Sequence, residues 1–350
     1  MTIAIEKSGK LGRRRHRGEH SVTIEDVAKQ AGVAPITVSR ALNTPEKVSL
    51  KLRTRIDLAV KALGYIPNLI AGGLASAGMR MIPVVVPSLS ILTFIEVLAG
   101  IQQTLEASGY QVLLGSTDFN LERETALVDS VLGYSPSGVI LTGLKHSDKT
   151  IHRLRSWGRP VVEMMELGDG AIDMNVGVDN TRVGATMAAH LLERGYRRIA
   201  YLGTGMMRDY RAIQRYEGHR QVLRDAGVES ELLFQYDEPS SYDIGRQLFL
   251  DALESFPELD ALHFANDNLA AGAILEANRR GIRVPHDIAI GGYLGLSLSE
   301  HLTPRLTTVA VPRFEMGVAA ARMLLMRLDK NESMASQLDI GHQLMVREST

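Results

Sequence analysis

The stretch from Thr23 to Asn43, TIEDVAKQAGVAPITVSRALN, decides how the N-terminal part of this 350-residue chain folds. Thr23 is followed three residues later by Asp26, a pattern typical of a helix start in which a hydroxyl and an acidic side chain cap the backbone. Apolar residues then recur with helical spacing as far as Gly32, which favours a helix end. Pro35 suits the start of another helix, where the N–H that proline lacks is not needed. We therefore predict two short helices joined by a tight turn.

A third helix is predicted directly after these two, from Ser49 to about Leu63, where Gly64 ends it. Its apolar residues recur on one face, and in the second helix Val38 faces inward while Arg40 faces outward. Two short helices supported by a third make a helix-turn-helix unit.

Charge is distributed unevenly between this head and the rest of the chain. Residues 1–79 contain 13 Lys and Arg against 6 Asp and Glu, whereas the remainder contains 26 against 34. A basic head on an acidic body is typical of a nucleic-acid-binding module joined to a second domain. Residues 1–20 are predicted to be a disordered basic arm, which either touches DNA phosphates or only adds solubility.

Composition excludes several classes of protein. The absence of cysteine removes disulfides, thiolate nucleophiles and cysteine-based metal sites. No apolar run approaches the roughly 18 residues that span a bilayer, and no secretory signal is recognisable, so we expect a cytoplasmic protein without a membrane partner. The sequence lacks the nucleophile elbow, the phosphate-binding loop, the dinucleotide fingerprint and the HExxH zinc motif. We expect no catalysis, no metal site and no cofactor.

The body alternates short apolar runs with amphipathic stretches, which predicts parallel sheets flanked by helices. The first half is expected to hold buried strands at Met81–Pro87, Gln111–Ser116, Gly138–Thr142 and Pro160–Met164, with helices at Phe94–Ala107 and Leu121–Leu132. After Asp179 the alternation restarts, with helices at Arg182–Arg194, Arg211–Ala226, Tyr242–Ser255 and Asn268–Arg280, and strands at Ile199–Leu202, Leu232–Gln235, Ala261–Ala265 and Ile288–Gly292. Two similar lobes fit this pattern better than one large sheet.

Four sequence blocks in the head closely resemble the DNA-binding domain of the LacI/GalR family of bacterial transcription regulators. They are Ile24–Ala28, Ala31–Val33, Thr37–Asn43 and Gly64–Asn68. The body looks like the two-lobed, periplasmic-binding-protein type of effector domain that completes the family fold. The resemblance implies an N-terminal all-α helix-turn-helix head and an α/β body with parallel sheets.

The resemblance also implies domain boundaries. The expected domains are the basic arm over 1–20, the helix-turn-helix domain over 21–66, a hinge helix or linker over 67–79, and an effector-binding and dimerisation domain over 80–350. In that fold the chain crosses between lobes three times, near residues 178, 310 and 337 here. One lobe would then comprise about 80–178 plus 311–337, and the other about 179–310 plus 338–350.

In that family the second helix enters the major groove of DNA. Arg40 has the side-chain geometry to bond guanine edges or phosphate, and Ile36 can contact a thymine methyl. Ala34 departs from the family, which often has a capping serine there. The residues expected to contact DNA are Thr23, Pro35, Ile36, Thr37, Ser39, Arg40, Asn43, Asn68 and Leu74.

Asn68–Ser76 matches the family's hinge helix, which orders on DNA beside its dimer mate. Leu74 stands where the family wedges a leucine into the minor groove to kink the duplex. Gly72 and Gly73 should each cost the helix about 1 kcal/mol relative to alanine, so its order should depend on DNA and on the dimer. A plain flexible linker is the alternative.

Effector residues of the family lie at the carboxyl ends of the strands. By position, the matching set here is Ser88, Phe94, Lys145, His146, Glu166, Arg215 and Asn266. Ordinary structural roles are the alternatives: a surface ion pair for Arg215, core packing for Phe94, and solvent exposure for Lys145 and His146.

The chemistry of the effector is indicated by one departure from the family. Sugar-responsive members often read Gly-Tyr-Asp-Asp where this chain reads Gly292-Tyr293-Leu294-Gly295, so a carboxylate is missing from the cleft. Its loss favours an anionic ligand over a neutral hexose. Pro160–Glu163, Val176–Asn180 and Tyr65–Asn68 are similar to the gluconate-repressor branch.

The resemblance therefore implies a repressor of carbohydrate catabolism genes. It would bind a palindromic operator in double-stranded DNA as a homodimer, associate with the nucleoid when bound, and answer gluconate or a related sugar acid. No heptad-repeat tail follows residue 340, which favours a dimer over a tetramer. Alternatives are a regulator that answers a neutral sugar or another metabolite, a sugar-binding transport component, and a sugar-modifying enzyme.

Overall fold

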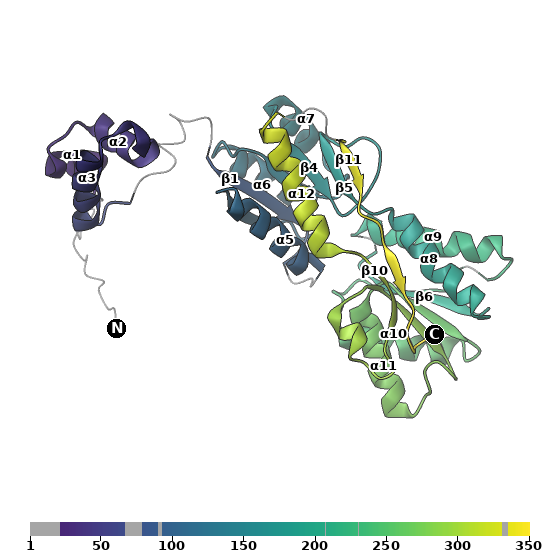
Figure 1. The fold of residues 1–350 in the computed structure, drawn as a ribbon. Helices are drawn as coiled ribbons and strands as arrows, with labels where there is room; N and C mark the ends of the chain where they lie inside the picture. Colours follow the sequence, from purple (N-terminus) through teal and green to yellow (C-terminus); the bar gives the residue numbers. More distant parts are fainter. Residues whose placement is uncertain (1–21, 67–78, 90–92, 207, 230, 331–334) are drawn as a thin grey trace, which may run out of the picture. The chain divides into compact units, whose positions relative to one another are not determined.

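A computed structural model describes residues 22–66, 79–89, 93–206, 208–229, 231–330 and 335–350. The chain divides into two compact units, Met1–Ala77 and Gly78–Thr350 (Figure 1). Within the described ranges, no helix is both long and apolar enough to cross a membrane.

The first unit contains α1 (Ile24–Ala31), α2 (Pro35–Asn43), a 3-10 turn at Pro45–Lys47 and α3 (Leu50–Leu63). The predicted cap of α1 is present: the hydroxyl of Thr23 accepts from the amide of Asp26 at 3.3 Å, and the carboxylate of Asp26 accepts from the amide of Thr23 at 2.9 Å. Gly32 ends α1 in the left-handed conformation. The three helices pack on a small core that includes the buried side chains of Val27, Val38 and Ile56, and the predicted helix-turn-helix fold is confirmed.

The second unit has two lobes, each built on a six-stranded sheet. The sheet of lobe 1 is parallel throughout, in the order β11-β5-β4-β3-β1-β2. Its strands are β1 (Met81–Val86), β2 (Gln111–Ser116), β3 (Val139–Thr142), β4 (Val161–Met164), β5 (Met174–Gly177) and β11 (Gln337–Asp339). The helices of this lobe are α5 (Thr93–Ala107), α6 (Leu121–Leu132), α7 (Asp148–Trp157) and α12 (Arg313–Leu328).

The sheet of lobe 2 has the order β12-β10-β9-β8-β6-β7, parallel except for β12. Its strands are β6 (Ile199–Thr204), β7 (Leu233–Tyr236), β8 (Ala261–Phe264), β9 (Ala289–Leu294), β10 (Thr307–Ala310) and β12 (Gln343–Met345). The helices are α8 (Asn180–Glu193), α9 (Tyr210–Asp225), α10 (Tyr242–Ser255) and α11 (Asp267–Arg280), with a 3-10 turn at Ser297–Glu300. Two parallel-rich lobes confirm the predicted fold class.

The chain passes between the lobes three times. It leaves lobe 1 after β5, returns after β10, and leaves again after β11. Figure 1 shows α12, from the C-terminal part of the chain, lying against elements of lobe 1. The third crossing falls at residues 340–342 instead of near 337, because Gln337–Asp339 still pairs with β5.

Sequence patterns missed several elements and misjudged one. No strand was predicted at β5, β10, β11 or β12, and no helix at α7 or α12. Gln111–Ser116 was expected to be buried, but it is the edge strand β2, with Leu113 38% and Leu114 40% exposed. An apolar run shows that a strand has no polar face, but it does not show whether the strand is central or at an edge.

Candidate DNA-reading helix and effector cavity

The exposed face of α2 carries residues predicted to contact DNA. Pro35, Ile36 and Arg40 are exposed, whereas Thr37 and Ser39 are half-buried. Ile36 is 59% exposed, so this large apolar side chain fills no core within the described head. Ala34 precedes α2 without a side-chain cap, as expected from the missing serine hydroxyl. The helix therefore presents an apolar group and a guanidinium one turn apart.

The remaining predicted DNA contacts are placed differently. Thr23 lies at the exposed start of α1, where its hydroxyl belongs to the helix cap. Asn43 is the last residue of α2. Asn68 and Leu74 lie outside the described residues, so the predictions for them stand untested.

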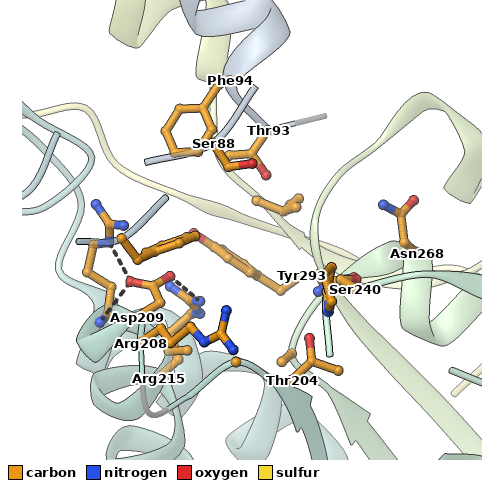
Figure 2. Close-up of a pocket in the computed structure, with 18 of the residues that line it drawn as sticks. Ser88, Thr93, Phe94, Thr204, Arg208, Asp209, Arg215, Ser240, Asn268 and Tyr293 are labelled. Atoms are coloured by element: carbon orange, nitrogen blue, oxygen red, sulfur yellow. Dashed lines mark hydrogen bonds and ion pairs between the residues drawn. The ribbon is translucent and has the colours of Figure 1, made fainter. Parts of the chain in front are cut away.

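A cavity of roughly 220 Å³ lies between the two lobes at the carboxyl ends of β6, β7, β8 and β9. The carboxyl ends of parallel strands meet at one edge of a sheet, where such proteins commonly bind ligands. Figure 2 shows Ser88, Thr93 and Phe94 of lobe 1 on one side, opposite lobe 2 residues. The lobe 2 lining includes Thr204, Arg208, Asp209, Arg211, Arg215, Asn266, Asn268 and Tyr293.

Arg215 is held in the cavity wall by several neighbours. Its Nη1 donates to the side-chain oxygen of Asn180 at 2.7 Å, and its guanidinium carbon lies 4.5 Å from the centre of the Tyr293 ring. A side chain at Gly184 would overlap the backbone of Arg215, so glycine lets α8 and α9 approach closely here. The Nε of Arg215 is buried without a hydrogen-bond partner among the described residues.

Arg211, one turn earlier on α9, is a second buried cation in this wall. Its Nε donates to Asp209 at 2.8 Å, while its Nη1 is buried without a partner in the described structure. Burial opposes ionisation, but the attraction of Asp209 outweighs it and raises the pKa of Arg211. Burial likewise raises the pKa of Asp209, but Arg211 and Arg215 outweigh that effect and lower it. Two guanidinium groups thus share one half-buried carboxylate.

The other acidic residues that line the cavity lie in more exposed positions than Asp209. Asp237 pairs with Arg208 at 3.0 Å and Asp118 with Arg123 at 3.3 Å, each with a well-exposed side chain. The less exposed part of the wall therefore holds two guanidinium groups against one carboxylate, that of Asp209. An anionic ligand in the cavity would balance this excess positive charge.

Four of the seven predicted effector residues line the cavity: Ser88, Phe94, Arg215 and Asn266. Phe94 is only 4% exposed, so it both packs in the core and closes one side of the cavity. The side-chain oxygen of Asn266 accepts from the amide of Leu269 and from the hydroxyl of Ser240, and thereby caps α11.

The other three predicted residues do not line the cavity. His146 is buried between Glu124 and Glu163, at 2.8 and 3.2 Å, and so does not face solvent as one alternative supposed. Lys145 is exposed, with its ammonium 5.7 Å from the centre of the Tyr210 ring. Glu166 is 4% exposed and bonded to protein groups of both lobes. Position at a strand end therefore did not bring these side chains to the cavity: His146 and Glu166 are bonded to protein groups instead, and Lys145 is exposed.

Sequence reasoning missed Arg211, Asp209 and Asn180 as cavity residues. One signal was available for the first, since residues four apart on a helix lie on the same face and Arg211 precedes Arg215 by four. Asn180 had no such signal, because it meets Arg215 only through the packing of α8 on α9.

This chain is similar to known proteins over both of its units. Residues 23–68 match the model of bacterial regulatory proteins of the lacI family, and residues 188–350 match a periplasmic binding protein-like domain. The regulator GntR of Pseudomonas aeruginosa is 40% identical over 329 residues, which cover 94% of this chain and 95% of that protein. GntR of Escherichia coli K12 is 38% identical, covering 92% of this chain and 96% of that protein.

Two solved structures of regulators are also similar to this chain. A LacI family transcriptional regulator from Silicibacter pomeroyi is 38% identical with a TM-score of 0.89, covering 94% of this chain and 99% of that one. The lac repressor dimer bound to operator is 25% identical with a TM-score of 0.79, covering 94% of this chain and 98% of that one.

A helix-turn-helix unit joined to a two-lobed, periplasmic-binding-like body defines the class of bacterial DNA-binding regulators. This chain belongs to the LacI family within that class. It is a regulator of transcription and not an enzyme.

Proposed function

We propose that this protein is a dimeric repressor of carbohydrate catabolism genes whose binding to a palindromic operator is controlled by a sugar acid, gluconate or a close relative. The observation that carries the effector assignment is the pair of guanidinium groups, Arg211 and Arg215, which line the cavity and share the single carboxylate of Asp209. A neutral sugar would leave the positive charge unbalanced, whereas a carboxylate accepts from both groups.

The reading of DNA is assigned to α2, with Ile36 and Arg40 at base edges. The region 67–79, with Asn68 and Leu74, would serve as the hinge, and the arm over 1–20 would add contacts to phosphates. Bound to its operator in this way, the protein would associate with the nucleoid. An effector releases the operator only if it binds the two conformations of the body with different affinities.

The effector assignment is tested by calorimetry with gluconate and with glucose as the neutral counterpart. We expect gluconate to bind and glucose to bind far more weakly. Arg215→Ala should weaken gluconate binding by about 1.5–3 kcal/mol, the range for a hydrogen bond to a charged group. Arg224→Ala is the matched control, since Arg224 lies on the same helix but is half-exposed and outside the cavity. Equal binding of the two sugars would contradict the assignment.

The DNA assignment is tested by gel shift and footprinting on the chain's own upstream region. Arg40→Ala should cost roughly 1–3 kcal/mol of operator affinity and relax the preference at one base pair, because a bidentate contact to guanine is lost. Lys61→Ala, an exposed cation on α3, should leave that preference intact. If Arg40→Ala weakened all sequences equally, the residue would contact only phosphate.

A further inference from the structure

The two lobes are joined beside the cavity by hydrogen bonds at the start of α9. The hydroxyl of Tyr210, in lobe 2, donates to Glu166 of lobe 1. The same oxygen accepts from the amides of Leu144 and Lys145 in lobe 1, at 2.9 and 3.2 Å. Burial and the neighbouring Glu166 raise the pKa of Tyr210, so this hydroxyl remains a donor at physiological pH.

Glu166 has both carboxylate oxygens occupied by protein donors. One accepts from the side-chain amide of Gln214 at 2.8 Å, and the other accepts from Tyr210 and from the amide of Leu144 at 3.2 Å. Two of these donors come from α9 of lobe 2 and one from lobe 1. Glu166, Tyr210 and Gln214 together are called the clasp below.

The lobe 1 turn that contains Gly143 and Leu144 contacts the Tyr210 hydroxyl of the clasp. Gly143 has a φ of +82°, and a Cβ added there would lie 2.7 Å from the Tyr210 oxygen. His146 joins this turn to the interior of lobe 1, since its ring contacts the carbonyl of Gly143 on one side and the carboxylates of Glu124 and Glu163. The turn thus leaves room for the tyrosine hydroxyl because position 143 has no side chain.

The clasp also touches the wall of the cavity. Asp209 and Arg211 line the cavity and flank Tyr210 directly in the chain. The Cβ position at Gly143 lies 3.2 Å from the unpartnered Nη1 of Arg211, so the lobe 1 turn covers that nitrogen. A ligand bound to Arg211 therefore lies next to the groups that join the lobes.

We propose that the clasp closes the two lobes over the bound effector, and that Glu166 is a positioning residue in it and not a ligand-reading one. The proposal rests on the proposed function, because it takes the cavity to be the effector site. When only the closed conformation binds well, the apparent dissociation constant rises as the closed fraction falls. Opening the clasp should therefore weaken effector binding without removing any ligand contact.

A charge exchange between two clasp residues gives the sharpest test. Gln214→Glu sets two carboxylates against each other, which should open the clasp at pH 8 and allow it to close near pH 5.5, where one of them takes up a proton. Its dissociation constant for gluconate, measured by calorimetry, should be roughly tenfold higher than wild type at pH 8 and approach wild type at pH 5.5. Wild type should not show this recovery.

The exchanged pair Glu166→Gln with Gln214→Glu restores one amide opposite one carboxylate and leaves an acceptor for Tyr210. Its affinity for gluconate should return to within about twofold of wild type, a change of under about 0.5 kcal/mol. Tyr242→Phe is the matched tyrosine control, because Tyr242 is 47% exposed on α10 and does not line the cavity.

Hydrogen exchange in the full chain separates this proposal from the effector assignment. The amides of Leu144 and Lys145 should exchange faster in Tyr210→Phe and in Gln214→Glu at pH 8, and at the wild-type rate in the exchanged pair. Unchanged exchange would overturn the clasp whether or not gluconate binds. Faster exchange with an unaltered dissociation constant would overturn its coupling to the cavity. If wild type does not bind gluconate, the effector assignment fails while the exchange rates still decide whether the clasp forms.

Discussion

At the scale of single residues, His146 shows how a buried polar group acquires a structural role. Burial opposes its positive charge, but hydrogen bonds to Glu124 and Glu163 outweigh burial and raise the pKa of His146 to about 9. The imidazolium therefore separates two carboxylates that would otherwise repel each other inside lobe 1. The stability that the charged His146 side chain gives to the fold should therefore depend on pH.

Replacing His146 by glutamine should lower the free energy of unfolding by about 3 kcal/mol or more at pH 6, the cost of leaving buried charge unpaired. Because the folded pKa exceeds the unfolded value near 6.5, the stabilisation is complete below pH 6.5 and is lost as pH rises through about 9. Urea denaturation between pH 6 and 10 measures this. His152→Gln, exposed on α7, is the control. A deficit that stays constant across this range would contradict the charged triad.

At the scale of single elements, α1 depends on its capping box more than on helix propensity, because eight residues are too few for an isolated helix. Thr23→Ala removes the side-chain acceptor and should reduce the stability of α1 by about 1 kcal/mol. Amide exchange across α1 in the full chain measures the change. Thr54→Ala is the control: Thr54 bonds a carbonyl inside α3 and caps nothing. Equal protection of α1 in both variants would show that tertiary packing alone holds this helix.

The accuracy of element prediction followed the locality of the signal. The caps of α1 and the Pro35 start of α2 depend on residues within four positions of each other, and the structure confirms both. The strand β11 has only three exposed residues and depends on pairing with β5, some 160 residues earlier in the chain. Such a strand leaves no periodic pattern to recognise.

At the scale of the whole molecule, β2 is an edge strand with exposed leucines at consecutive positions, Leu113 and Leu114. Side chains at consecutive strand positions point to opposite faces, so both faces of this edge are apolar. Soluble proteins rarely leave such an edge uncovered. We infer that a second copy of the chain covers it in the proposed dimer.

Leu114→Lys should shift the protein toward monomer, because a lysine ammonium would be desolvated in the interface. Analytical ultracentrifugation at micromolar concentration measures the change, and operator affinity should fall with it. Val346→Lys, an exposed apolar position after β12 in lobe 2, is the control. If Leu114→Lys sedimented as wild type does, the interface would lie elsewhere.

The amino-acid sequence by itself determined the helix-turn-helix head, the two-lobed body, the family and the position of Arg215, because each leaves a local pattern of caps, periodicity or motif spacing. The tertiary structure decided which polar side chains face the cavity. Glu166 and His146 stand at strand ends like ligand-reading residues, yet both are bonded to protein groups, as far as 22 positions away for His146 and 48 for Glu166. Arg211 and Asn180 reach the wall only because α8 and α9 pack closely. Hydrogen bonds form between groups that the fold brings close together in space. The number of residues between two groups in the sequence does not show how close the fold brings them.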